Sequence, residues 1–106
     1  MIRTFLRNKY ILVDGEVKVC NDLLTWAQWF EQSDTERIVA QDRIGDIHVS
    51  TVFLGLDHSF GRGEPLLFET VIFSGEHDGY QERYSTREAA LDGHVKALAL
   101  VTPDGA

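Results

Sequence analysis

The chain has 106 residues, of which 43% are hydrophobic and 25% are charged, and its formal net charge is −7. This length suits one domain and is too short for two independent cores, while the composition excludes a disordered or fibrous chain. Cys20 is the only cysteine, so an intramolecular disulfide and a thiolate-rich zinc site are also excluded. We expect a single domain over residues 1–106, with a flexible tail at 101–106.

The charge is distributed unevenly along the chain. Residues 1–20 carry four basic and two acidic side chains, whereas residues 21–106 carry six basic and fifteen acidic ones, a formal charge of −9. Such a surface repels a phosphate backbone, which disfavours direct nucleic-acid binding. It suits either docking into a basic protein groove or simply the maintenance of solubility.

The beginning of the chain, residues 1–7, has a short apolar stretch broken by arginines and lacks the features of a signal peptide. No stretch approaches the roughly 18 apolar residues that a membrane helix needs. Together with the lone cysteine, this predicts a protein of a reducing, cytoplasmic compartment with no membrane partner.

The first expected element is a hairpin, because residues 10–13 and 16–20 are rich in β-formers and are joined by Asp14-Gly15. A helix over 22–32 follows. Asn21 is its expected cap, and its core-facing stripe contains Leu23, Trp26 and Phe30.

Four strands are expected next, at 37–41, 47–54, 66–73 and 80–84, connected as an antiparallel meander. Ser85 and Glu88 have the spacing of a capping box and open a second helix. Its apolar face would carry Leu91, Val95 and Leu98, with Ala90, His94 and Val101 beside them. The prediction is an α+β fold: an antiparallel sheet of four to six strands with two helices, in the order β-β-α-β-β-β-β-α.

The loop at residues 56–65 is the densest group of chemically active side chains. Asp57 next to His58 could orient an imidazole for general-base work, but no nucleophile can be identified. The alternative is a solvated connection in which Asp57 or Ser59 bonds to its own backbone. The glycines around Arg62 lack the lysine and the following helix of a phosphate-binding loop.

Metal and cofactor sites are not expected. The histidines at positions 48, 58, 77 and 94 have no pair at the spacing that places two ligands on one helical face. Glu69 is unusual because it interrupts an apolar strand. It could pair with Arg83 on the next strand or belong to a polar site under the loop.

Two segments resemble a widespread family of small bacteriophage and prophage proteins: Ser50 to Gly61 with Pro65 to Thr70, and Gln81 to His94. The resemblance spans about residues 9–98 and carries no established catalytic role. It implies an anti-CRISPR inhibitor of type II effectors such as Cas9, without enzymatic activity, in a bacterial host cell. The residues expected to bind that partner are Asp57, His58, Phe60, Arg62 and Glu64.

Two other functions stay open. A small-molecule-binding or hydrolytic domain would gather Asp57, His58, Arg62, Glu64 and Glu69 at one edge of the sheet. A phage accessory protein would act through an exposed sheet edge or an aromatic patch. The chain is expected to be a monomer or a homodimer.

Overall fold

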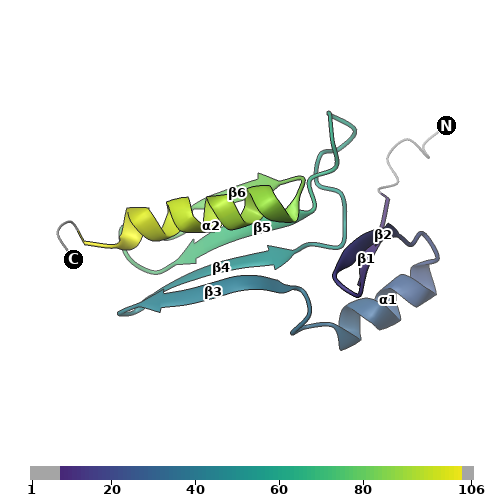
Figure 1. Ribbon diagram of the computed structural model, residues 1–106, viewed down its shortest axis with the longest axis horizontal. Coiled ribbons are helices and arrows are strands. Elements are labelled where there is room, and N and C mark those ends of the chain that lie inside the picture. The colour runs from purple at the N-terminus through teal and green to yellow at the C-terminus, as the bar shows by residue number, and fades with distance from the viewer. Residues whose placement is uncertain (1–7, 104–106) are drawn as a thin grey trace.

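The computed structural model describes residues 8–103, and its elements follow the expected order, with two helices and two antiparallel sheets (Figure 1). The α+β prediction is confirmed. A two-stranded sheet pairs β1 with β2, and a four-stranded sheet has the order β3-β4-β5-β6. The bounds are β1 Tyr10–Val13, β2 Glu16–Val19, α1 Leu23–Gln32, β3 Ile38–Ile44, β4 Ile47–Phe53, β5 Phe68–Phe73, β6 Gln81–Tyr84 and α2 Arg87–Val101.

The β1–β2 hairpin turns at Asp14 and Gly15, whose φ angles of 52° and 83° suit the two central positions of a type I′ turn. The hairpin is tied to the end of β4 by its backbone, since Tyr10 N–H donates to the Gly55 carbonyl over 2.8 Å. The Trp26 indole of α1 donates to the carbonyls of both Tyr10 and Gly55 at 3.1 Å. One side chain thus joins α1, β1 and the segment after β4.

Helix α1 begins one residue later than expected, and its N-cap is Asp22. The expectation that Asn21 caps it is wrong, because the Asn21 Oδ1 atom instead accepts from the Lys9 N–H over 2.9 Å. The helix has no fully buried residue. It is held through aromatic contacts, with the Trp29 ring edge-on to Phe53 at 5.9 Å.

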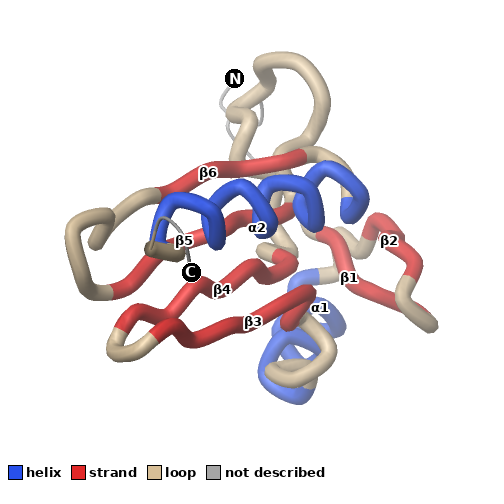
Figure 2. Tube along the Cα trace, turned by 60° about the vertical axis from the view of Figure 1, so that its left-hand side comes forward, coloured by secondary structure: helices blue, strands red, loops and turns tan. Residues whose placement is uncertain are grey.

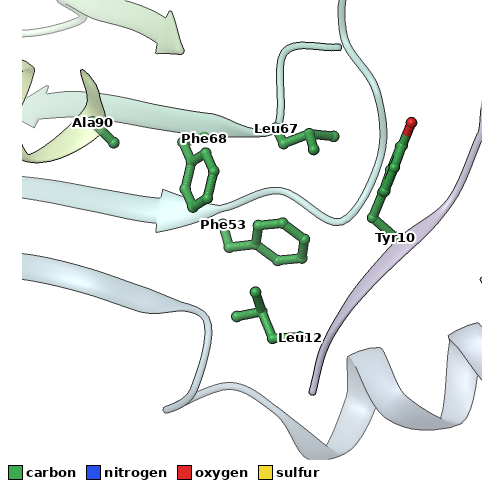
Figure 3. Packing of buried hydrophobic residues seen from close by; sticks show 6 residues of the cluster. All are labelled: Tyr10, Leu12, Phe53, Leu67, Phe68 and Ala90. Carbon is green, nitrogen blue, oxygen red and sulfur yellow. The ribbon is translucent and has the colours of Figure 1, made fainter. Parts of the chain in front are cut away.

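Helix α2 lies along one face of the four-stranded meander (Figure 2). Phe53 and Phe68, from the adjacent strands β4 and β5, pack edge to face and are almost fully buried beneath its first turns. They form a cluster with residues of β1, of α2 and of the segment before β5 (Figure 3), namely Tyr10, Leu12, Leu67 and Ala90. A second cluster, Val49, Ile72, Ala97 and Val101, continues the core toward the other end of the helix.

The start of α2 differs from the prediction, and its buried face differs in part. Its N-cap is Thr86 rather than Ser85, because the Thr86 hydroxyl accepts from the Ala89 N–H over 3.1 Å. Leu91 and Val95 are 43% and 66% exposed, so they do not form its core face. Ala90, His94 and Val101, expected beside them, do face the sheet, together with Gly93 and Ala97. Most of these side chains are small.

This small-residue face lets the helix approach the sheet closely. A Cβ atom built on Gly93 would lie 2.1 Å from the hydroxyl of Tyr84, far inside van der Waals contact. Gly93 therefore makes room for the Tyr84 ring, and the large side chains that fill the layer come from the strands.

The C-terminal end of α2 is part of the core. Val101 is its last residue and is 9% exposed, so the helix continues into the expected tail. The rest of that expectation falls partly on residues 104–106, which lie outside the described residues. Within residues 8–103, neither helix has the length and hydropathy needed to cross a bilayer.

We predict that Gly93→Ala destabilises the protein by about 2 kcal/mol, although alanine normally favours a helix by about 1 kcal/mol. The reason is the overlap between the new methyl group and Tyr84. Urea unfolding measures the effect, and Lys96→Ala on the exposed side of the same helix is the control, expected within about 0.5 kcal/mol of the wild type. A Gly93→Ala protein more stable than the wild type would contradict the close packing.

Candidate functional site

The loop between β4 and β5 contains the five residues expected to bind a partner. It projects beyond the end of the sheet in Figure 1. Asp57 Oδ1 accepts from the Ser59 N–H over 2.7 Å and from the Leu66 N–H over 3.0 Å. The His58 N–H donates to the Leu66 carbonyl over 3.0 Å. These bonds fasten the two ends of the loop to each other.

The electrostatics of Asp57 agree with this anchoring role. Burial favours the protonated carboxyl, but the hydrogen bonds from Ser59 and Leu66, together with the nearby His58, outweigh it, so the pKa of Asp57 lies below its ordinary value of 3.8. A carboxylate held as an anion by backbone N–H groups stabilises a loop.

His58 is also occupied within the loop. Its Nδ1 atom lies 2.9 Å from the Leu56 carbonyl oxygen, so the ring bonds to the backbone just before it. Since Asp57 bonds to backbone N–H groups, the two neighbours do not form an acid–base pair with each other. The hydroxyl of Ser59 is buried and makes no hydrogen bond within residues 8–103.

Beyond these anchors the loop exposes Phe60, Arg62 and Glu64. Phe60 is 65% exposed, and its φ of 55° is in the left-handed region that a bulky residue rarely adopts. Such backbone strain is concentrated at ligand clamps and other functional positions. The structure thus divides the five expected partner residues: two hold the loop, and three are presented to solvent.

Glu69, near the start of β5, bonds to the neighbouring strand. Its carboxylate accepts from Arg83 Nε over 3.0 Å across the β5–β6 pair, so the predicted cross-strand ion pair is confirmed. With the Asp57 and Glu69 carboxylates both bound to other groups, the residues proposed for a hydrolytic site do not act as one cluster.

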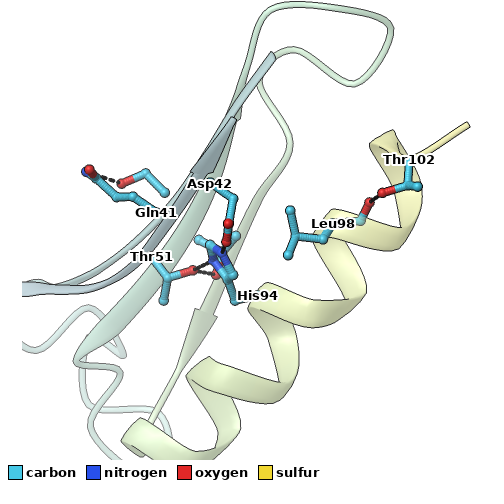
Figure 4. Close-up of polar contacts among 8 residues, drawn as sticks. Gln41, Asp42, Thr51, His94, Leu98 and Thr102 are labelled. Carbon is cyan, nitrogen blue, oxygen red and sulfur yellow. Dashed lines mark hydrogen bonds and ion pairs between the residues drawn. The ribbon is translucent and has the colours of Figure 1, made fainter. Parts of the chain in front are cut away.

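A polar chain that sequence reasoning missed connects α2 to the sheet (Figure 4). His94 Nε2 lies 2.8 Å from Asp42 Oδ2 on β3, and His94 Nδ1 lies 2.7 Å from the Thr51 hydroxyl on β4. The Thr51 hydroxyl in turn meets that of Thr70 on β5 at 2.5 Å. Asp42 and His94 are 52 residues apart, so no local motif indicates this contact.

The order carboxylate, imidazole, hydroxyl is that of a hydrolase triad, but the chemistry does not follow. Thr51 and Thr70 are both 0% exposed, so no substrate can reach either hydroxyl. The ionised Asp42 carboxylate can only accept a hydrogen bond, so the hydrogen of the His94 ring is on Nε2. The Thr51 hydroxyl next to Nδ1 of His94 is enclosed by the sheet and the helix. The chain of hydrogen bonds is therefore a structural link between helix and sheet.

A groove of about 400 Å³ lies between β6 and α2. It is lined by Tyr80, Tyr84 and the charged residues Glu82, Arg83, Asp92 and Lys96. The Tyr84 hydroxyl is buried and makes no hydrogen bond to a described residue. Burial raises the pKa of Tyr84, with Tyr80 and Glu82 adding to the effect and the nearby Thr70 hydroxyl opposing it. The loop residues line no part of this groove.

We predict that Asp57→Ala costs about 1–3 kcal/mol near neutral pH, because two backbone N–H groups lose their acceptor. The folded pKa of Asp57 is depressed, so its stabilisation is complete above 3.8 and decreases as the pH falls through the lower folded pKa. The wild-type advantage should therefore shrink as the pH is lowered below 3.8 in a series of urea unfolding measurements. Asp46→Ala, in the β3–β4 turn, is the control, and an advantage that grows on acidification would refute this role.

We predict that Thr51→Val destabilises the protein by about 1–3 kcal/mol, because His94 and Thr70 lose a buried partner while the side-chain volume is kept. A double-mutant cycle with His94→Leu should give a coupling energy of about 0.5 kcal/mol or more. Additive effects in chemical denaturation would mean that the two side chains are not energetically linked.

Within residues 8–103, no three His, Cys, Asp or Glu side chains are grouped so as to hold a metal ion. The arrangement that remains most suited to function is the anchored loop with its exposed tip. Comparisons of the chain with protein-family models, with curated proteins and with solved structures found no match.

Proposed function

We propose that this chain is a non-enzymatic inhibitor carried by a bacteriophage or prophage, which binds a CRISPR effector nuclease of the Cas9 type in the bacterial cytoplasm and blocks it. The anchored β4–β5 loop is the proposed contact, with Phe60, Arg62 and Glu64 touching the partner. Asp57 and His58 contribute by holding the loop in place.

The observation that carries the proposal is the combination of hydrogen-bonded closure and exposure in this loop. Hydrogen bonds from Asp57 close it, yet Phe60 at its tip is 65% exposed. An exposed aromatic on a preorganised loop loses little conformational entropy on binding, and aromatic residues are common among the side chains that dominate interface energies.

The charge of the chain supports a basic partner. Residues 21–106 carry a formal charge of −9, and the channel of a nuclease that reads nucleic acid through its backbone is positively charged. A total of −7 is modest for imitating a long duplex. Blocking by shape, with a local acidic patch to steer association, fits better than mimicry of nucleic acid.

The polar groups that could suggest an enzyme support binding instead. The hydroxyl in the Asp42, His94 and Thr51 chain is inaccessible, and the Asp57 carboxylate is bonded to the backbone. The proposal therefore assigns the chain no substrate and no cofactor.

We predict that the purified chain captures Cas9 in a pull-down, with or without guide RNA, and that capture weakens from low to high salt. Phe60→Ala should weaken binding by at least about tenfold, as expected for an interface anchor. Glu64→Lys should weaken it more than Glu76→Lys, which makes the same change of charge in the β5–β6 turn at the opposite end of β5.

Two results would overturn this proposal. Absence of capture in every condition would exclude Cas9 as the partner. Equal effects of Glu64→Lys and Glu76→Lys, with no effect of Phe60→Ala, would mean that overall charge rather than the loop determines binding. Circular dichroism of each variant confirms that it is folded.

A further inference from the structure

One face of the four-stranded sheet is not covered by any helix or strand of residues 8–103. Helix α2 packs on the other face, and α1 contacts β1 at the end of the molecule. Strand alternation and the pairing register define the uncovered face, here called the open face. Its side chains are Ile38, Gln41, Arg43, His48, Ser50, Val52, Glu69, Val71, Phe73, Gln81 and Arg83.

An apolar band crosses the open face diagonally. Ile38 pairs with Val52 on the neighbouring strand, Val71 is the diagonal neighbour of Val52, and Phe73 lies two residues further along β5. Phe73 is 48% exposed and its ring lies 5.8 Å from that of His48. Neither core cluster includes any residue of this band.

The charge of the open face differs from that of the rest of the chain. Two arginines and one glutamate give it a formal charge of +1, so the remainder of the chain carries −8. The glutamate, Glu69, is bonded to Arg83 at 3.0 Å. A second copy of this acidic chain would meet like-charge repulsion at most other surfaces, but not here.

We propose that the open face is a homodimer interface, in which two copies pack sheet against sheet about a two-fold axis. The dimer would have four layers in the order helix, sheet, sheet, helix, with the α2 helix of each copy in an outer layer. A basic partner protein has no electrostatic reason to select this face, so it is separate from the loop contact proposed above.

The size of the face suits a reversible dimer. Strands about 4.8 Å apart, rising about 3.3 Å per residue, give a flat footprint on the order of 400 Å² for the four strands. Side chains that project from the sheet add to this flat area and bring the buried surface closer to about 600 Å² per partner, the lower end for specific interfaces. We therefore expect a dissociation constant on the order of 10 µM.

The free edge of β3 is a poorer route to self-association. A bulge interrupts its pairing between Ile38 and Ala40, and the exposed Asp42 and Arg43 place charges along it. Bulges and charges are the usual protection of an edge strand against pairing with another chain. The open face has no such protection at its centre.

Sedimentation equilibrium of the full chain, from about 5 to about 500 µM, tests the proposal. The wild type should form a reversible dimer that high salt does not weaken. Val71→Lys, at the centre of the face, should raise the dissociation constant at least tenfold, because it would bury two ammonium groups. Val95→Lys makes the same change on α2, where Val95 is 66% exposed, and should leave the dimer intact.

A wild type that stays monomeric at the highest concentration would overturn the proposal, as would dissociation by Val95→Lys but not by Val71→Lys. Circular dichroism establishes folding, and Phe73→Ser replaces Val71→Lys if the latter does not fold. Val71 lies within β5 and is not a loop residue. Val71→Lys should therefore still bind Cas9 if the proposed function holds, so the two proposals fail separately.

Discussion

At the contact between α2 and the sheet, small side chains of the helix pack against large side chains of the strands. Ala90, Gly93 and Ala97 present little volume, so the helix comes close enough for Gly93 to lie directly over Tyr84. That distance also brings His94 within hydrogen-bonding reach of Asp42 and Thr51. Close packing and a satisfied polar chain thus stabilise the same interface, and each depends on the other.

This single-sided packing shapes the rest of the molecule. A sheet covered by one helix has one buried and one uncovered face, which is common in antiparallel sheets. The hairpin and α1 are attached at the end of the sheet through the Trp26 indole and the aromatic contact of Trp29 with Phe53. The described part of the chain therefore has an extended form of about 53 × 28 × 22 Å.

Three surfaces with different properties result. The first is the β4–β5 loop, which is closed by Asp57 and exposes Phe60. The second is the solvent side of α2, where Leu91 and Val95 are exposed. The third is the open face, which is almost neutral. In a chain of net charge −7, these differences separate a surface that suits a basic partner from one that suits a second copy. The two proposals follow from that separation and use different residues.

The element order, the Asp14-Gly15 turn and the Glu69–Arg83 pair were all predictable from the amino-acid sequence, because each depends on residues close in the chain or on simple strand alternation. The exact caps were not, since Asn21 and Ser85 have near-equivalent neighbours that compete for the same backbone groups. The sequence also identified the loop as the richest polar segment and offered the bonding of Asp57 to its own backbone as one alternative. It did not indicate that Asp57 also bonds to the Leu66 N–H at the other end of the loop.

Only the tertiary structure decided which face of α2 is buried and which polar groups meet across the layers. Apolar periodicity favoured a wide face that held Leu91 and Val95 as well as Ala90, His94 and Val101. Only the last three of these are buried, because Phe53, Phe68 and Tyr84 already fill the space beside the helix. The contact of His94 with Asp42 spans 52 residues and arises only when β3 lies beside α2. Local patterns record what a segment prefers, whereas packing between distant segments depends on the shape that all of them form together.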